Sequence, residues 1–296
     1  MSAATAAPAA NALHVEGFFD PATFTATYVV HDPATRRAAI IDPVLDYNPR
    51  NARTSTKSAD ALLDYVAREG LTLDWLLETH AHADHLSAAH YLRDQIGAPI
   101  VIGRHITAVQ KAFAPLFGAD DVTPDGSQFD RLVEEGDDLP LGDLSIRVMH
   151  TPGHTPACVT YLIGDAAFVG DTLFMPDYGT ARSDFPGGSA EALYASIRKI
   201  LSLPPETRMY VGHDYLPAGR TEYAFETSVA AQNAGNVHIH AGVSEADFVA
   251  QREARNALLE APALILPSLQ VNIRAGAMPP AESNGKTYLK LPINAL

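Results

Sequence analysis

Short apolar runs rich in β-branched and aromatic residues recur through the first two thirds of the chain and predict β-strands. The runs are FTATYVV, RAAIID, LDWLLET, PIVIG, LSIRVMH, CVTYLIG, AAFVGD and RMYVGH. Turn residues in HDPATR connect the first two runs, and Gly164-Asp165 connects CVTYLIG to AAFVGD. Each of these two pairs is therefore predicted to form a β-hairpin.

Amphipathic segments between the apolar runs predict helices. SADALLDYVAREG extends from a candidate cap at Ser58 to a glycine stop at Gly70, and DHLSAAHYLRDQIG extends from Asp84 to Gly97. EALYASIRKIL predicts a third helix. This mixture of strands, hairpins and helices predicts an α/β protein with mixed sheets flanked by helices. The polar stretches DYNPRNARTSTK and GADDVTPDGSQFD are predicted to be surface loops.

The chain shows no segment with the composition of a linker. After about residue 217 the pattern becomes mostly helical, and it ends in a Pro-rich segment. We therefore expect a single domain over residues 12–296 with a C-terminal elaboration over about 217–296, and a flexible tail over residues 1–11. The sequence assigns no role to residues 46–57 or to the C-terminal tail, which are candidates for the substrate mouth or a homodimer contact.

The charge and the cysteine content of the chain exclude some classes of function. Lys and Arg number 21 against 35 Asp and Glu, and the net charge of −14 argues against binding to nucleic acid. An anionic small substrate would need a local cationic anchor. A single cysteine, Cys158, cannot form an intramolecular disulfide, and no run approaches the roughly 20 apolar residues of a membrane span. We expect a cytoplasmic protein with no membrane partner, and Cys158 as a small buried apolar residue.

Titratable side chains cluster at the ends of four apolar runs. In open α/β sheets, ligands bind beyond the carboxyl ends of the strands, so we expect these side chains to converge. Imidazole nitrogens and carboxylate oxygens suit zinc and iron, and the set is large enough for one or two ions. Taken singly, each residue also has a structural explanation, such as a helix cap or a turn. The set comprises His80, His82, Asp84, His85, His154, Asp171 and His213.

The motifs THAHADH, TPGHT, GDTLF and VGHDY, in that order, resemble the metallo-β-lactamase superfamily over roughly residues 12–230. Within it, THAHADHLSAA, TPGHTPACVTY, ARSDF and GHDY are most similar to persulfide dioxygenases, the sulfur-oxidising relatives of glyoxalase II. The resemblance implies an αββα sandwich of two mixed sheets flanked by helices. It also implies one Fe(II) per chain, held by His80, His154 and Asp171, and oxidation of glutathione persulfide by O2 to sulfite and glutathione.

The same resemblance leaves the metal open. In the zinc hydrolases of the superfamily, His80, His82 and His154 would hold one Zn(II), and Asp84, His85 and His213 the other, with Asp171 bridging. If one iron is bound, the residues His82, Asp84, His85 and His213 would orient and tune its ligands. The rival functions are a binuclear zinc thioester hydrolase of the glyoxalase II type and, among non-enzymes, a metal-binding sensor or sulfur-carrier partner.

Two residues are candidate substrate contacts. Arg182 in ARSDF follows the metal aspartate and could bind a glutathione carboxylate in bidentate fashion, or it could pair with Asp184 as a loop arginine. The resemblance favours the glutathione site, with Tyr215 in GHDY as a second contact. A homodimer and a sulfurtransferase partner are further expectations that the residues leave open.

Overall fold

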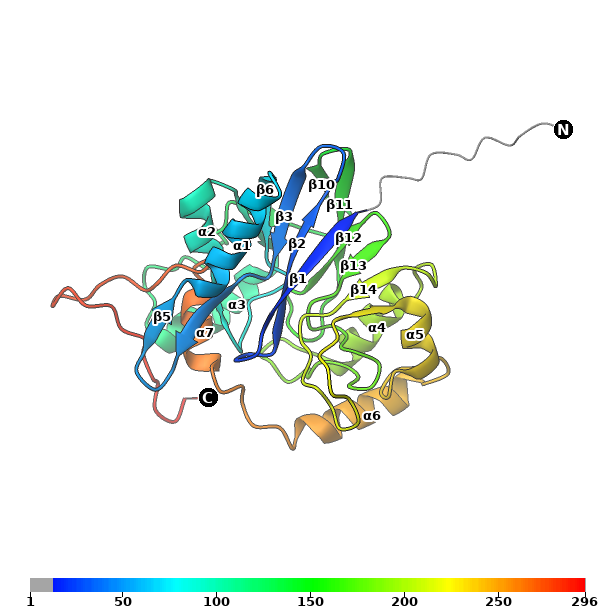
Figure 1. Ribbon diagram of the computed structural model, residues 1–296. Helices are drawn as coiled ribbons and strands as arrows, with labels where there is room; N and C mark the ends of the chain where they lie inside the picture. Colours follow the sequence, from blue (N-terminus) through cyan, green and yellow to red (C-terminus); the bar gives the residue numbers. More distant parts are fainter. Residues whose placement is uncertain (1–12, 296) are drawn as a thin grey trace.

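The computed structural model describes residues 13–295, so the tail predicted over residues 1–11 lies outside the described part of the chain. Two six-stranded sheets lie face to face, with helices on both outer faces (Figure 1). The space between the sheets is filled by apolar side chains from both, including Tyr28, Val101, Tyr161 and Phe168. The αββα sandwich predicted from the sequence is therefore confirmed.

The first sheet has the order β1-β2-β3-β6-β8-β9. Its first three strands are antiparallel, and β3, β6, β8 and β9 run parallel to one another. The hairpin predicted through HDPATR is β2–β3, in which Tyr28 faces Ile41 and His31 faces Ala38. The strands are β1 (His14–Asp20), β2 (Thr25–His31), β3 (Arg37–Ile41), β6 (Thr72–Leu77), β8 (Ile100–Gly103) and β9 (Arg131–Val133).

The second sheet has the order β10-β11-β12-β13-β14-β15 and is antiparallel except for the parallel pair β13 and β14. The hairpin predicted at Gly164-Asp165 connects β12 to β13, and Gly164 has the positive φ of 59° that such a turn needs. The strands are β10 (Asp138–Leu141), β11 (Leu144–His150), β12 (Val159–Ile163), β13 (Ala166–Phe168), β14 (Arg208–Tyr210) and β15 (Glu226–Ser228).

A small third sheet corrects one expectation. The stretch DYNPRNARTSTK contains a hairpin formed by β4 (Val44–Asn48) and β5 (Arg53–Ser55), not a surface loop. Its other neighbour is β7 (Leu86–Ser87), which follows the histidine-rich segment. The stretch forms strands because β4 finds a partner about 40 residues away in sequence, which local polarity does not indicate.

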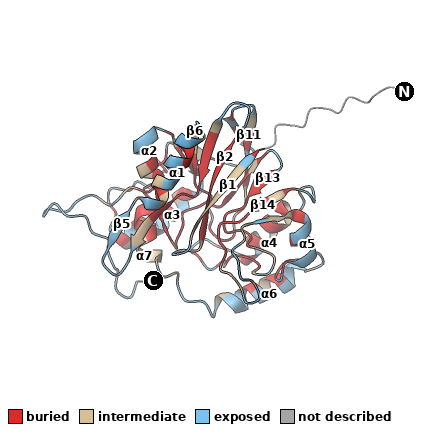
Figure 2. Cartoon of the chain, in the orientation of Figure 1, coloured by how far each residue is buried: buried red, intermediate tan, exposed pale blue. Residues whose placement is uncertain are grey.

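Helices cover the two outer faces. On the first sheet lie α1 (Lys57–Arg68), α2 (Ala89–Ile96), α3 (Ile106–Phe117) and α7 (Ile265–Asn272), which share one apolar cluster. On the second lie α4 (Ala190–Ile200), α5 (Val229–Gly235) and α6 (Glu245–Asn256). The C-terminal elaboration thus packs on both outer faces of the sandwich, and the helices turn their buried sides inward (Figure 2).

Two predicted helix starts were wrong. The helix expected from Asp84 begins at Ala89, because Leu86 and Ser87 pair with β4 instead; its predicted stop is confirmed by Gly97 at φ 74°. The helix expected to be capped by Ser58 begins at Lys57, and Ser58 donates through its backbone N and its Oγ to Asp46 at 3.0 and 2.7 Å. In the described residues, no helix is both long and apolar enough to cross a membrane.

Candidate metal centre

The seven predicted metal-ligating side chains lie together at one edge of the sandwich. The segment with His80 to His85 follows β6 of the first sheet, and the other three residues follow β11, β13 and β14 of the second. Six of them are at most 7% exposed, whereas the Asp84 side chain is 24% exposed. Because the strands of both sheets end at this edge, the arrangement follows from the fold. The three residues from the second sheet are His154, Asp171 and His213.

One group of ligand atoms consists of His80, His154 and Asp171, all within 4.8 Å of one another. The Oδ2 atom of Asp171 lies 3.9 Å from Nε2 of His80 and 3.7 Å from Nε2 of His154. Ligand atoms that each lie about 2.1 Å from a shared metal ion are about 3 to 4 Å apart, so the group has the dimensions of a metal site. Two imidazoles and one carboxylate are a ligand set typical of non-haem iron.

A second group lies on the other side of Asp171. The Oδ1 atom of Asp171 is 3.3 Å from Nε2 of His213, and the same nitrogen is 3.2 Å from Oδ2 of Asp84. His82, Asp84 and His213 form a group within 4.8 Å, and His85 is not among its members in the described residues. Asp171 therefore stands between two groups with one oxygen toward each.

The ring of His80 is held in the tautomer that a metal ligand needs. Thr79 donates its hydroxyl proton to Asp42 Oδ2 at 2.7 Å. Because that proton is used, the hydroxyl oxygen of Thr79 accepts a hydrogen bond from His80 Nδ1 at 3.0 Å. With the proton on Nδ1, the lone pair of Nε2 faces the cluster. Burial, followed by the charges of the other histidines, holds the pKa of His80 well below its usual value, which keeps the ring neutral.

Three further rings are oriented in the same way by backbone carbonyls. Carbonyl oxygens can only accept, so each of these histidines carries its proton on Nδ1 and leaves the lone pair on Nε2. The pairs are His154 with the oxygen of Arg182 at 2.9 Å, His213 with that of Phe24 at 3.1 Å, and His85 with that of Leu86 at 3.1 Å.

Several buried polar atoms at this edge have no hydrogen-bond partner among the described residues. Unpaired buried nitrogen and oxygen atoms are costly, and so many of them around one point fit a bound cation. The donor set of neutral imidazoles and carboxylates is also chemically suited to iron or zinc. These atoms include Nε2 of His80, His85 and His213, Oδ1 of Asp171 and Oδ2 of Asp84.

His82 has a different environment from His80. Its Nε2 atom lies 3.0 Å from Asp42 Oδ1 and 3.2 Å from Glu78 Oε2. Burial by itself lowers the pKa of His82, but the two carboxylates more than offset this effect and raise the pKa well above its usual value. One ring nitrogen of His82 therefore faces carboxylates rather than the first group of ligands.

Two glycines next to the ligands are required by close packing. At Gly153, in TPGHT, φ is 135° and a Cβ atom would lie 2.2 Å from the backbone N of Leu193. At Gly212, before His213, a Cβ atom would lie 2.6 Å from Oδ1 of Asp171. Any side chain at these positions would displace a ligand or the helix behind it.

A cavity of about 390 Å³ opens over Asp84, His154 and Asp171. Its volume lies within the range of small-molecule sites. Both predicted substrate contacts, Arg182 and Tyr215, lie in its wall. Four aromatic and three arginine side chains contribute to that wall: Phe24, Phe174, Tyr178, Tyr215, Arg182, Arg252 and Arg255.

Arg182 takes the position of a paired loop arginine. Its Nε and Nη2 atoms donate to both carboxylate oxygens of Asp184 at 2.6 and 2.7 Å, and its Nη1 donates to the backbone oxygen of Glu260 at 2.7 Å. Its own carbonyl oxygen orients His154. A substrate contact of Arg182 stays a prediction, and its guanidinium is already bound to Asp184 and to the carbonyl of Glu260.

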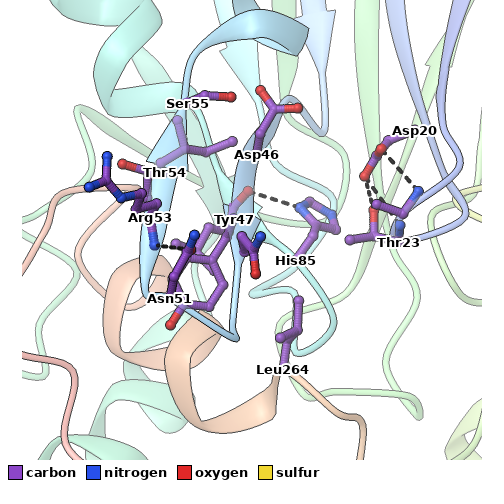
Figure 3. Close-up of a pocket in the computed structure, with 14 residues that line it drawn as sticks. Asp20, Thr23, Asp46, Tyr47, Asn51, Arg53, Thr54, Ser55, His85 and Leu264 are labelled. Carbon is purple, nitrogen blue, oxygen red and sulfur yellow. Dashed lines mark hydrogen bonds between the residues drawn. The ribbon is translucent and has the colours of Figure 1, made fainter.

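A second cavity, of about 360 Å³, lies beneath the β4–β5 hairpin and reaches His85 (Figure 3). Tyr47, Asn51 and Arg53 of the hairpin line it, together with Leu264 from the C-terminal elaboration. Thr23 and Leu264 also line the first cavity, so the two cavities adjoin. The segment 46–57 thus forms a wall near the metal centre.

Sequence reasoning missed several residues that support the site. Asn272 donates through Nδ2 to the backbone oxygens of His82 and His85 at 2.8 Å each, and its Oδ1 accepts from Ser87 N at 2.8 Å. No local pattern marks this asparagine in the C-terminal segment. Asp42, in contrast, closes the apolar run RAAIID and carries the same strand-end signal as the predicted ligands.

The fold, the strand-end ligands and a family match over residues 20–213 together define the class of this protein. The chain belongs to the metallo-beta-lactamase superfamily, an α/β fold of mixed sheets flanked by helices. This confirms the family resemblance and the fold class predicted from the motifs.

Similar proteins carry several names. A probable metallo-hydrolase of Burkholderia pseudomallei (strain 1710b) is 58% identical over 294 residues, which cover 95% of this chain and 99% of that protein. Glyoxylase B2 of Dictyostelium discoideum is 48% identical and covers 97% of the chain and 99% of its own length. Mitochondrial persulfide dioxygenase ETHE1 of Homo sapiens is 34% identical over 201 residues, 67% of this chain and 66% of that protein.

The crystal structure of ETHE1 from Myxococcus xanthus is also similar. It superposes with a TM-score of 0.71 at 34% sequence identity, over 89% of this chain and 100% of that one. Some relatives are longer than this chain, which spans 65% of the beta-lactamase hydrolase-like protein of Agrobacterium fabrum (strain C58 / ATCC 33970) at 54% identity. The chain thus belongs to a superfamily of metallo-hydrolase-type enzymes. Some of its relatives are named as hydrolases and others as dioxygenases.

Proposed function

We propose that this chain is a mononuclear non-haem iron persulfide dioxygenase that oxidises glutathione persulfide with O2 to sulfite and glutathione. The observation that carries the proposal is the group of His80, His154 and Asp171. Among the described residues, His82 groups with Asp84 and His213 rather than with His80 and His154, and His85 belongs to neither of these two groups. Two imidazoles and one carboxylate leave positions open for two further ligands.

The comparisons support the same activity at a coarser level. ETHE1 proteins are similar in sequence and in structure, and the human one is named a persulfide dioxygenase. The ARSDF motif, which follows Asp171, is shared with that branch in the resemblance stated above. We therefore assign His80, His154 and Asp171 as the ligands of one Fe(II).

The side chains around the site have separable roles in this proposal. Bound Fe(II) would supply a centre at which the persulfide sulfur and O2 meet. The carbonyls of Arg182 and Leu86 and the hydroxyl of Thr79 fix the imidazoles. The aromatic wall, including Tyr215, excludes bulk water and confines the reactants, which is how proximity accelerates a reaction. One persulfide, one O2 and one water give one glutathione, one sulfite and two protons, so no side-chain nucleophile is required.

A second candidate is a binuclear zinc thioester hydrolase of the glyoxalase II type. The group of His82, Asp84 and His213 beside Asp171 Oδ1 favours it, because a second ion could be held there. Glyoxylase B2 of Dictyostelium discoideum, at 48% identity, has a name of the same kind. Two zinc ions held by these residues would then activate water for attack on the thioester.

Oxygen consumption decides between the two. The full chain, loaded anaerobically with Fe(II), is mixed with glutathione persulfide, and O2 and sulfite are measured together. We expect O2 and sulfite in a ratio near one to one, and no uptake by a zinc-loaded sample or by His80→Ala. If protein shown to hold Fe(II) consumes no O2, the dioxygenase is excluded for this substrate; hydrolysis of an acylglutathione by the zinc form would then establish the second candidate.

A further inference from the structure

Phe24 lies in the turn between β1 and β2 and has a backbone conformation that is unusual for a bulky residue. Its φ is 59°, and it is the only aromatic residue with a positive φ in residues 13–295. The left-handed region is disfavoured for any residue with a Cβ atom, because that atom approaches the following carbonyl oxygen. A residue stays in such a conformation only where its surroundings hold it, and residues of this kind cluster at functional sites. The conformation therefore points to a role for Phe24 at the neighbouring metal centre.

Hydrogen bonds to the segment that carries His213 hold Phe24 in this conformation. Its carbonyl oxygen accepts from Nδ1 of His213 at 3.1 Å and from the backbone N of Asp214 at 3.1 Å. Two residues further on, the backbone N of Ala26 donates to the oxygen of Gly212 at 2.8 Å. These bonds offset the strain of the left-handed backbone, and they fix the turn of the first sheet to a strand end of the second.

The side chain of Phe24 forms part of the wall of the metal-site cavity. Its ring centroid lies 5.6 Å from that of Tyr215. The ring of Tyr215 in turn lies 5.7 Å from that of Phe174 and 4.9 Å from that of Tyr178. The rings of Phe174 and Tyr215 also lie 6.2 and 5.5 Å from the ring of His213. At these separations aromatic rings are in contact, so the four aromatic side chains form one continuous wall beside His213.

The aromatic wall lies where a group attached to the substrate sulfur would extend. The cavity opens over His154 of the first ligand group and over Asp84 of the second. In the proposed reaction the substrate sulfur meets the metal at the first group, so an attached group that extends toward the second group meets the aromatic wall. A persulfide carries one further sulfur atom at this point, whereas a thioester carries an acyl group. The position of the wall therefore sets how large an attached group the cavity accepts.

We propose that Phe24 is a specificity-determining residue whose ring limits the size of the group attached to the substrate sulfur. One residue then serves two purposes, because its carbonyl orients His213 and its ring completes the aromatic wall. The class of substrate, a glutathione derivative, rests on the proposed function. The size limit favours a persulfide over a thioester, and it acts on binding, so it holds whichever reaction follows.

The first test measures binding without a reaction. Binding of S-methylglutathione and of S-hexylglutathione to the full chain, loaded anaerobically with Fe(II), is measured by calorimetry, and we expect the wild type to prefer the methyl derivative. Phe24→Gly removes the ring and suits a positive φ. It should raise the affinity for the hexyl derivative about tenfold, the gain from burying about two methylene groups, and leave that for the methyl derivative unchanged. Phe24→Leu should keep most of the preference. Tyr223→Ala is the matched control, because this ring lies 6.4 Å from that of Phe24 but does not line the cavity.

The second test measures the strained backbone through stability. Alanine is ordinarily favoured over glycine, because glycine loses more conformational freedom on folding. At a φ of 59° the order reverses, since glycine adopts this conformation without strain and alanine does not. We therefore expect a higher urea midpoint for Phe24→Gly than for Phe24→Ala at the same iron content. A higher midpoint for Phe24→Ala would overturn the strained conformation and with it the proposal.

The outcomes separate the size limit from the reaction. A gain in S-hexylglutathione affinity in Phe24→Gly, with no O2 uptake by the iron-loaded wild type, would support the size limit and overturn the dioxygenase. O2 uptake together with the same ratio of the two affinities in the wild type and in Phe24→Gly would overturn the size limit and leave the dioxygenase standing. Absence of S-methylglutathione binding to the wild type, or an equal gain in Tyr223→Ala, would also overturn the size limit.

Discussion

The metal cluster and the cavity wall that faces it come from different parts of the chain. The cluster is built from strand ends between His80 and His213, and backbone carbonyls or buried hydroxyls fix most of its rings. The arginines of the wall come from α6, beyond the segment that matches the family. The first region thus lies within the segment that matches the family, and the second lies in the C-terminal elaboration. The candidate ligands and the cationic part of the cavity wall therefore come from separate segments of the chain.

The separation is incomplete, because the C-terminal elaboration also supports the cluster. Asn272 of α7 bonds the carbonyls of His82 and His85, and so holds the loop that carries the ligands. Variants that affect only metal binding, only substrate binding, or both can test how far the two regions are independent.

The largest effect is expected within the cluster. His80→Ala removes a ligand, and even groups that only orient ligands are worth about 10- to 100-fold in affinity or activity, so we expect a loss of more than about 100-fold in iron binding. Iron is counted by mass spectrometry after anaerobic loading and gel filtration. His90→Ala, on α2 and outside the cluster, is the control. Stoichiometric iron in His80→Ala would remove His80 from the ligand set.

The ligands that follow strands could be predicted from the sequence, because ligand-binding side chains in α/β sheets gather at the carboxyl ends of strands. Side chains such as His80, Asp171 and His213 directly follow apolar strands, and the fold brings those ends together. The predicted strands and the hairpins at HDPATR and Gly164 follow from local patterns in the same way. The choice of metal could not be predicted, because the same imidazoles and carboxylates suit both iron and zinc.

The parts that could not be predicted depend on contacts between distant segments. Asn272 lies 190 residues from His82, and its hydrogen bonds leave no local periodicity. The strand β4 depends on β7, and the start of α2 shifts from Asp84 to Ala89 for the same reason. Arg252 and Arg255 are ordinary helix residues in the sequence, and only the position of α6 places them at the cavity.

The second largest effect on iron binding is expected from Asn272→Ala. This variant tests whether the metal cluster depends on the C-terminal elaboration. The change leaves the amide of Ser87 and the carbonyls of His82 and His85 without their partner, at about 1 kcal/mol or more for each buried group. We expect the free energy of unfolding in urea to fall by about 3 kcal/mol and iron affinity to fall about tenfold. Asn284→Ala, which removes exposed hydrogen bonds to Tyr288 and to the backbone N of Lys286, should change neither quantity. If the two variants were equally stable, α7 would have no role in the cluster.

A smaller loss of iron affinity is expected from Gly212→Ala, because this change affects the metal cluster and not the cavity wall. The added Cβ atom would meet Asp171 Oδ1 at 2.6 Å, so Asp171 must shift. Overpacking of this kind costs about 1 to 3 kcal/mol, and we expect iron affinity to fall severalfold with no change in the affinity for S-methylglutathione. Gly235→Ala, where a Cβ atom meets nothing within 4 Å, is the matched control. A parallel loss of ligand affinity would show that the two regions are coupled through Asp171.

The smallest effect is expected at Cys158, which lies close to His154 in sequence but belongs to the buried framework. Its Sγ accepts from Thr155 N at 3.3 Å, and burial raises the pKa of the thiol to about 12. A raised pKa disfavours the thiolate, so reactivity should increase only at much higher pH. We expect no alkylation by iodoacetamide in the folded protein at pH 8, full alkylation in guanidinium chloride, and unchanged oxygen uptake in Cys158→Ala. Rapid alkylation of the folded chain, or loss of uptake with iron still bound, would place the thiol in the chemistry and extend the reactive region beyond the metal cluster.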